Sequence, residues 1–425
     1  MRKTEERGKT MHLLKKLYCR TFQIGMRTVL PILPYREPKP LKSIQGIIPI
    51  LKRRRIKRVL LVTDNGVRKA GITKPLERLL IEENIQCFIY DKTVANPTVE
   101  NVEEAAKIYR KGKCKALIAV GGGSAMDCAK AVGARIVRPH TPLCRMEGIL
   151  KVIKKLPLLI AVPTTAGTGS ETTLAAVITD EKTHRKYPIN DFVLIPRYAI
   201  LDPQMTISLP PHLTATTGMD ALTHAVEAYI GRSTTKHTRT MSVDAIRLIF
   251  ENLEIAYQDG NNYEARQNML RAAYLAGASF TQSYVGYVHA VAHSLGGKYG
   301  MAHGLTNAVL LPIVLEEYGE AAYEKLADLA RRTGISYDVN DEVAAKKFIV
   351  KIREMNKKME IPNALSGILE EDIEALAKHA DHEANPLYPV PVLWDVKQLK
   401  KIYYLVREEK RYDRVTNQKS IKYTA

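Results

Sequence analysis

The 425-residue sequence is poor in features that direct a chain into a membrane or an extracellular scaffold. It has no run of about 18 or more apolar residues, which argues against a transmembrane helix. Basic residues such as Lys15 and Arg20 interrupt the start of the chain, where a signal peptide would need an apolar core. The five cysteines lack metal-type spacing. We therefore expect reduced thiols in a cytoplasmic protein.

Acidic residues are scarce near the N-terminus. Residues 1–60 hold 17 Lys and Arg against three Glu, a net charge of +14, which leaves +5 for the other 365 residues. We therefore expect no specific binding of nucleic acid by the body of the protein. The densest basic cluster, residues 52–58, is interpreted as a solvated helix end or loop. Attraction of the basic segment to an anionic partner (a membrane surface, nucleic acid or an acidic protein) is the alternative.

Apolar runs that alternate with helical patterns predict a parallel, doubly wound sheet in the first half of the chain. The predicted strands cover residues 58–63, 85–90, 115–120 and 158–162. The helical patterns include residues 98–111, and an amphipathic helix is expected within residues 11–33.

After Pro210 the strand signal fades. Helices are predicted at residues 213–229, 240–256, 263–278, 284–295 and 317–332. We expect three parts: a basic extension (1–42), a dinucleotide-binding α/β domain (43–209) and an all-α domain (210–425). The polar tail from Arg407 onward is expected to be poorly ordered.

Two loops rich in small residues follow predicted strands. The third strand runs into Gly121, Gly122, Gly123 and Ser124, with Asp127 on the helix that follows. Glycines let backbone amides approach a diphosphate, and a helix N-terminus adds partial positive charge. Plain turn chemistry is the alternative, because this is not the G-x-G-x-x-G pattern.

The second loop, residues 163–171, contains Thr164, Thr165 and Thr168. Loops at the carboxyl ends of parallel strands converge on one crevice, which favours a dinucleotide site. Asp64 ends the first strand. Its carboxylate there would accept hydrogen bonds from a ribose and repel a 2′-phosphate, which favours NAD over NADP. A turn-forming Asp is the alternative.

Histidines and one aspartate recur at helical spacing in the second half. Asp220 and His224 lie four residues apart, as do His289 and His293, and His303 follows. Buried ionisable groups are costly unless they are paired or bind a metal. One carboxylate and three imidazoles suit a divalent first-row metal. The spacing leaves open whether His293 or His303 completes the site.

These motifs together resemble the iron-containing (type III) alcohol dehydrogenase family, over roughly residues 58–400. The resemblance is carried by residues 121–127, 163–171, 215–229 and 289–312. It implies an α/β domain, a helical domain and a metal in the cleft between them, Fe²⁺ first and Zn²⁺ as the alternative. It also implies a homodimer.

The resemblance further implies roles for individual residues. Asp220, His224, His289 and His303 would be the metal ligands, and His293 a nearby proton relay. Lys186 would contact the cofactor ribose, and Thr164 and Thr168 would lie in the cofactor loop. The basic extension departs from the family pattern, as does Ala175, at a cofactor-side position that is often polar.

The sequence therefore predicts a metal-dependent NAD(H)-linked alcohol dehydrogenase or aldehyde reductase. A bound divalent metal would act as a Lewis acid on the substrate oxygen, while hydride passes between the carbinol carbon and nicotinamide. The alternatives are a hydroxyacid–oxoacid transhydrogenase with tightly bound nicotinamide and a maleylacetate-type reductase. A non-catalytic binding protein would have no use for four metal ligands and two cofactor loops.

Overall fold

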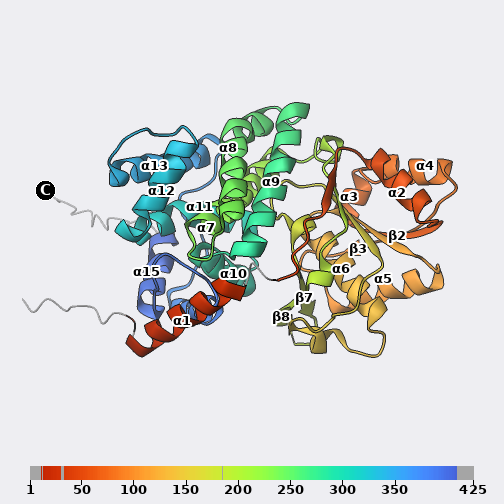
Figure 1. Cartoon of the computed structure of the whole chain (residues 1–425), viewed down its shortest axis with the longest axis horizontal. Coiled ribbons are helices and arrows are strands. Elements are labelled where there is room, and N and C mark those ends of the chain that lie inside the picture. Colours follow the sequence, from red (N-terminus) through yellow and green to blue (C-terminus); the bar gives the residue numbers. More distant parts are fainter. Residues whose placement is uncertain (1–10, 12, 30–32, 184, 409–425) are drawn as a thin grey trace, which may run out of the picture.

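A computed structural model describes residue 11 and residues 13–29, 33–183 and 185–408 of the chain. The strands gather in one half of the molecule, and the helices that follow them in the chain form the other half (Figure 1). This arrangement confirms the predicted α/β and all-α fold class. The limits of the three predicted parts stay a prediction.

The main sheet has six strands in the order β1-β9-β6-β4-β2-β3, and every neighbouring pair is parallel. The strands are β1 (Lys39–Leu41), β2 (Arg58–Asp64), β3 (Gln86–Thr93), β4 (Ala116–Gly121), β6 (Leu158–Pro163) and β9 (Tyr198–Ile200). The four predicted strands are confirmed. β1 and β9 were not predicted, because three residues are too few to show a period.

The order of the strands places a switch point between β2 and β4. The chain leaves β2 toward β3 on one side, then crosses back to β4, β6 and β9 on the other. In open α/β sheets a crevice forms at such a point, beyond the carboxyl ends of the strands. β2 ends at Asp64 and β4 at Gly121, so both residues lie at this crevice.

Helices cover both faces of the sheet. They are α2 (Ile47–Arg53), α3 (Asn65–Lys69), α4 (Lys74–Glu82), α5 (Val99–Lys111) and α6 (Gly123–Val137). α5 and α6 pack on one face, and α2 and α4 on the other. The predicted helix at 98–111 is confirmed, and it begins at Thr98, whose hydroxyl accepts from the Asn101 amide in a capping box.

A second, three-stranded sheet extends this half. Its strands are β5 (Gly148–Ile149), β7 (Ala175–Asp180) and β8 (Arg185–Asn190), in the order β5-β8-β7. β7 and β8 form an antiparallel pair. The sequence analysis did not predict this sheet, because only some of its residues are buried and several of its positions are charged.

Nine helices of the described chain make up the other half. They are α7 (Pro211–Ile230), α8 (Lys236–Gln258), α9 (Tyr263–Ser283), α10 (Tyr287–Tyr299), α11 (His303–Tyr318), α12 (Glu320–Arg332), α13 (Asp341–Lys358), α14 (Ile373–Ala384) and α15 (Val396–Val406). The predicted helix at 317–332 is wrong in part. Gly319, at φ +52, separates α11 from α12. The predicted helix at 284–295 begins later, because Tyr284 has φ +63 at the end of α9.

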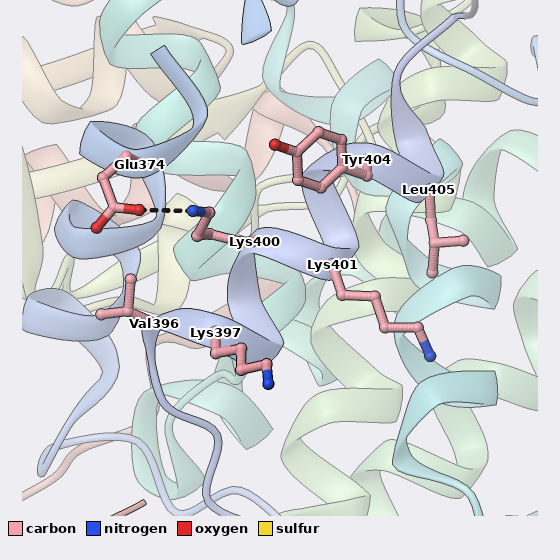
Figure 2. Close-up of a pocket in the computed structure, with 7 residues that line it drawn as sticks. All are labelled: Glu374, Val396, Lys397, Lys400, Lys401, Tyr404 and Leu405. Carbon is pink, nitrogen blue, oxygen red and sulfur yellow. Dashed lines mark hydrogen bonds and ion pairs between the residues drawn. The ribbon is translucent and has the colours of Figure 1, made fainter. Parts of the chain in front are cut away.

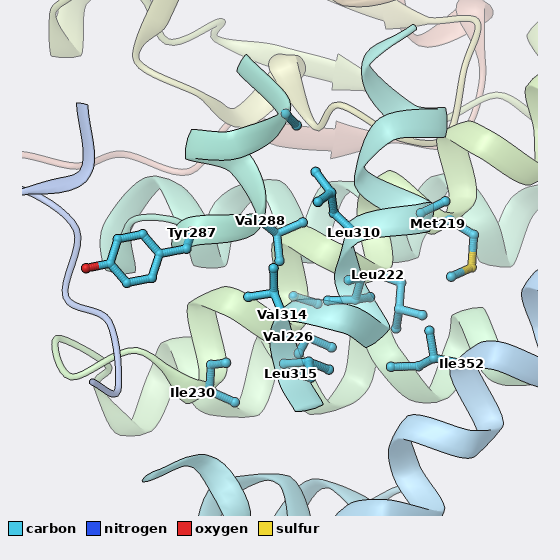
Figure 3. Close-up of a cluster of buried hydrophobic side chains, with 14 of the residues drawn as sticks. Met219, Leu222, Val226, Ile230, Tyr287, Val288, Leu310, Val314, Leu315 and Ile352 are labelled. Atoms are coloured by element: carbon cyan, nitrogen blue, oxygen red, sulfur yellow. The ribbon is translucent and has the colours of Figure 1, made fainter. Parts of the chain in front are cut away.

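The helical half has a dense apolar core around α7. Met219, Leu222 and Val226 of α7 are fully buried or nearly so, and they pack with Leu310 and Val314 of α11 (Figure 3). Interiors of this kind are close-packed and leave little freedom to move. Polar residues that share these helices are therefore held in fixed positions.

The two halves meet through close backbone contact. Gly169, in the second small-residue loop, has φ +59, and a Cβ atom built on it would lie 2.6 Å from the Cα of Gly277 on α9. A Cβ on Gly167 would lie 2.7 Å from the carbonyl oxygen of Thr217 on α7. The loop that follows β6 is therefore seated directly on the helical half.

The basic N-terminal region contains a helix, as predicted within residues 11–33. α1 runs from Leu13 to Val29 and lies against the helical half (Figure 1). The basic cluster at 52–58 covers the end of α2 and the turn into β2, and Lys52 forms an ion pair with Glu83. The basic residues of this cluster are exposed, as the interpretation as a solvated helix end or loop expects, and the alternative of an anionic partner stays a prediction. Most of the tail from Arg407 lies outside the described residues.

None of the helices in the described ranges combines the length and the apolar character needed to cross a membrane.

We expect Gly169→Ala to lower the free energy of unfolding by about 2–4 kcal/mol, because a side chain there is strained at positive φ and collides with Gly277. Urea unfolding measures this. The matched control is Gly297→Ala in α10, where no atom lies within 4 Å of the added Cβ. That change should be neutral or stabilise by up to about 1 kcal/mol. Equal effects of the two substitutions would contradict the prediction.

Candidate active site

Four of the predicted residues converge in the helical half. Asp220 and His224 come from α7, His289 from α10 and His303 from the first residue of α11. One ligand atom from each lies within 4.8 Å of the other three. His293 is not in this group. The structure therefore brings together the set that includes His303.

The distances within this cluster suit a small cation. His303 Nε2 lies 3.4 Å from Asp220 Oδ1, and His289 Nε2 lies 3.9 Å from the same oxygen. His224 Nδ1 is 4.0 Å from Asp220 Oδ2. A tetrahedral metal bound at about 2.1 Å needs ligand atoms about 3.4 Å apart. Movements that bring together ligand atoms up to 4.8 Å apart would close the set on a first-row metal.

Two polar atoms show that the cluster calls for an electropositive partner. The side-chain nitrogen of Asn307, Nδ2, donates to Asp220 Oδ1 at 2.7 Å. The same nitrogen lies 3.2 Å from His289 Nε2 and 3.1 Å from His303 Nε2. His224 Nδ1 is buried and has no hydrogen-bond partner. A buried acceptor left unpaired is costly. A bound cation would satisfy it.

Burial keeps the three imidazoles in the neutral form that binds metals. Desolvation lowers the pKa of His303 to about 4 and lowers the pKa of His289 well below its usual value. Desolvation also lowers the pKa of His224, although Asp220 counteracts it. Metal ligands must be deprotonated, so these residues are prepared for coordination at neutral pH.

Glu227 fixes the orientation of His289. Its carboxylate accepts from His289 Nδ1 at 2.6 Å, from the Gly286 amide at 2.9 Å and from the Val288 amide at 2.8 Å. This directs His289 Nε2 into the cluster. Burial raises the pKa of Glu227 to about 7, and the two backbone donors act against that rise. Carboxylates that support a metal-binding His in this way set its tautomer and orientation.

His293 occupies a separate position beside the cluster. Its ring stacks on His303 with centroids 5.2 Å apart, and its side chain is 42% exposed. Nδ1 lies 2.6 Å from Glu383 Oε1, which also accepts from the Tyr388 hydroxyl at 2.7 Å. Desolvation lowers the pKa of His293, but the Glu383 carboxylate outweighs it and the net pKa is raised. His293 therefore holds a proton more readily than the three imidazoles of the cluster.

The two small-residue loops face each other at the crevice of the sheet. The Thr164 amide donates to the Gly121 carbonyl at 3.1 Å. A Cβ on Gly122 would lie 3.4 Å from Thr165 Oγ1, and one on Gly123 would lie 3.2 Å from Thr168 Cγ2. The predicted convergence of the loops is confirmed. Their backbone lies at the N-terminus of α6, where an anionic group is favoured.

The second loop also reaches the metal-ligand cluster. A Cβ on Gly167 would lie 2.7 Å from the carbonyl oxygen of Thr217, so this loop is seated on α7, the helix that carries Asp220 and His224. Phe280 of α9 covers the other side of His224, with ring centroids 4.2 Å apart. The two small-residue loops and the metal-ligand cluster therefore lie side by side and form one continuous site.

Asp64 lies at the crevice and also caps a helix. Its Oδ1 accepts from the Val67 amide at 2.9 Å, as the turn-forming alternative requires. Its Oδ2 lies 3.4 Å from the position of a Cβ on Gly121. One oxygen is therefore engaged in the turn, and the other faces the glycine loop.

Asp127 braces the second loop. It accepts from Ser170 Oγ at 2.9 Å and from the Val177 amide of β7 at 3.1 Å. Lys130, which is fully buried, donates to Ser170 Oγ at 3.1 Å and to the Ala175 carbonyl at 2.8 Å. Desolvation lowers the pKa of Lys130 to about 8. Both oxygens of Asp127 are thus used inside the protein.

Two further predicted cofactor residues are placed less centrally. Ser124 Oγ accepts from the Asn96 amide at 3.3 Å. Lys186 is exposed on β8, opposite Thr179 of β7, and its side chain forms no hydrogen bond or ion pair with another described side chain. The ribose contact of Lys186 stays a prediction.

A surface hollow of about 590 Å³ on α15 is a different feature (Figure 2). Lys397, Lys400, Lys401 and Tyr404 line it, and Lys400 pairs with Glu374 at 2.7 Å. It shares no residue with the ligand cluster or with the two loops.

The sequence analysis missed Glu227, Asn307 and Phe280. A signal existed for two of them. Glu227 lies seven residues after Asp220, and Asn307 four residues after His303, so each shares a helix face with a predicted ligand. Phe280 carried no such signal, because only the packing of α9 on α7 brings it to His224.

Comparison with known proteins identifies relatives over most of the chain. The model "Iron-containing alcohol dehydrogenase" matches residues 41–203, and "Fe-containing alcohol dehydrogenase family, C-terminal" matches residues 214–405. Alcohol dehydrogenase 4 of Saccharomyces cerevisiae is 38% identical over 80% of this chain and 89% of its own length. The 1,3-propanediol dehydrogenase of Klebsiella pneumoniae is 41% identical over 77% and 86%. A solved 1,3-propanediol oxidoreductase superposes with a TM-score of 0.83 at 36% identity, covering 87% of this chain and 98% of that one.

We expect Glu227→Gln to weaken metal binding about 10–100-fold. The substitution removes the negative charge beside His289 Nδ1 and replaces one of the two carboxylate oxygens that accept hydrogen bonds. Competition with a chelator, followed by the metal retained on the protein, measures the change. Glu251→Gln, at an exposed position on α8, is the control and should leave the affinity unaltered. An unchanged affinity in Glu227→Gln would exclude this supporting role.

Proposed function

Since the chain belongs to the iron-containing alcohol dehydrogenase family, we propose that it transfers hydride between small alcohols or aldehydes and NAD(H) at the continuous site between its two halves. Membership makes it a metal-dependent alcohol dehydrogenase that uses NAD(H) and iron. The close approach of Gly167 to Thr217 carries the proposal, because it seats the second small-residue loop on α7, the helix that holds Asp220 and His224. The named relatives are dehydrogenases, so the transhydrogenase alternative is not favoured.

The metal would be held by Asp220, His224, His289 and His303. When bound, it supplies Lewis-acid chemistry for a substrate oxygen. The protein contributes the rest: Glu227 orients one imidazole, and Phe280 shields His224 from water. The glycine loop and the N-terminus of α6 bind and orient the dinucleotide diphosphate.

His293 is proposed to move the proton that accompanies hydride transfer. It lies against His303, it is partly exposed, and Glu383 holds a proton at its Nδ1. These properties suit an exchange of protons between the site and solvent. Thr164, Thr165, Thr168 and Ser124 are proposed as cofactor-loop contacts and Lys186 as a ribose contact. Asp127 is proposed to act by bracing the loop.

We also propose a cytoplasmic homodimer. All five cysteines are free, which suits a reducing compartment. The three-residue edge strand β1 leaves one edge of the main sheet thinly covered. Sedimentation of the full chain measures its mass.

The reaction is tested by following NADH oxidation against a panel of short aldehydes. Protein loaded anaerobically with Fe²⁺ or Zn²⁺ should turn over, and the metal-free protein should lose nearly all of its activity, because the substrate oxygen is then not polarised. Asp220→Asn should lose activity together with bound metal. Full turnover by the metal-free protein would exclude the proposed role of the cluster.

The preference for NADH is tested by Asp64→Asn. This change keeps the cap on the Val67 amide but removes the charge that repels a 2′-phosphate. We expect the ratio of kcat/KM for NADPH to that for NADH to rise roughly tenfold. Asp91→Asn, near the end of β3, serves as the control. If the ratio does not move, Asp64 serves only as a helix cap.

A further inference from the structure

Helix α1 presents its apolar side chains to solvent. Leu13 is 76% exposed, Leu17 63%, Tyr18 60% and Ile24 64%. Leu13, Leu17 and Ile24 are spaced so that they lie along one side of the helix, with Tyr18 beside them. These four residues are termed the α1 stripe. Exposed apolar residues that occur singly need no explanation, but a contiguous row on one helix does.

Polar side chains of α1 attach the helix to the rest of the protein. Lys15 forms an ion pair with Asp381 of α14 at 2.7 Å. Arg20 donates to the carbonyls of Val390 and Pro391 at 2.9 and 3.0 Å, and Gln23 donates to the Tyr388 carbonyl at 2.7 Å.

An amphipathic helix of a globular protein normally turns its apolar side inward. Here the helix is fixed by one ion pair and by hydrogen bonds, and Cys19 is buried beneath it. The outward direction of the α1 stripe is therefore specified by definite contacts.

The charge around the stripe identifies the kind of surface that it fits. Lys16 and Arg27 are exposed on the same helix and lie one above the other along its border. Residues 1–10, which precede the helix in the sequence, add four basic residues against two glutamates. A second copy of this face would bring like charges together, and nucleic acid offers no apolar layer for Leu17 and Ile24. An anionic lipid bilayer matches both properties.

We propose that α1 docks the enzyme onto anionic membranes. The helix lies flat in the interfacial region, with the α1 stripe among the acyl chains and Lys16 and Arg27 at the lipid phosphates. It does not span the bilayer, in agreement with the lack of a spanning helix among the described residues. α1 runs along one edge of the helical half, and the main sheet lies in the other half (Figure 1).

The test is flotation of the full-length, metal-loaded protein with vesicles of phosphatidylglycerol and phosphatidylcholine. The protein should float with the anionic mixture, should be released by high salt, and should not float with phosphatidylcholine alone. The double variant Leu17→Glu/Ile24→Glu should bind anionic vesicles at least about tenfold more weakly. Lys16→Gln and Arg27→Gln should each weaken binding roughly fivefold.

The control is Val343→Glu/Val350→Glu on α13, two exposed apolar residues with the same spacing of seven. It should bind vesicles like the unmodified protein, and both double variants should keep the aldehyde turnover and the melting temperature. Equal binding by the two double variants, or no binding of the unmodified protein to anionic vesicles, overturns the proposal. If the α1 variant instead lowers the oligomeric mass without any vesicle binding, a second copy covers the stripe and the proposal is wrong.

Discussion

The structure of the active site depends on one buried carboxylate. Glu227, on α7, accepts hydrogen bonds from two backbone amides at the start of α10 and from His289 Nδ1. It therefore links α10 to α7 and also orients the His289 imidazole. Such a charge survives without water only where its acceptors are fully used. The apolar core around α7 keeps these partners in place. The cluster is therefore as rigid as the helix packing that surrounds it.

Much of this arrangement was readable from the sequence, because it rests on local patterns. Buried parallel strands appear as continuous apolar runs, so β2, β4 and β6 were predicted, and the loops that follow them could be placed at one crevice. Helical spacing placed Asp220 and His224 on one face. The choice between His293 and His303 depended on how α11 meets α10, a tertiary relation that spacing does not contain. In the structure His303 Nε2 lies 3.4 Å from Asp220 Oδ1 and joins the cluster, which favours His303 as the ligand.

The features that could not be predicted from the sequence were missed for physical reasons. The β7–β8 pair alternates buried and exposed positions with charged residues among them, so its apolar signal is weak. The break at Gly319 depends on a single positive-φ residue. The amphipathic character of α1 was evident, but not its direction. Which side of a helix faces the protein is decided by partners such as Asp381 and the carbonyls near Tyr388, more than 350 residues away in the chain.

The candidate metal ligands and the nucleotide-binding loop come from different halves of the molecule, and this has a consequence for how the metal and the nucleotide bind and are replaced. All four candidate ligands come from helices of one half, whereas the glycine loop and Asp64 come from the sheet of the other. A nucleotide can therefore leave and return without breaking any bond to the ion. Conversely, an ion that is lost or exchanged leaves the nucleotide cradle intact. The two cofactors have separate lifetimes on the protein, and metal supply in the cell can set activity long after the chain has folded.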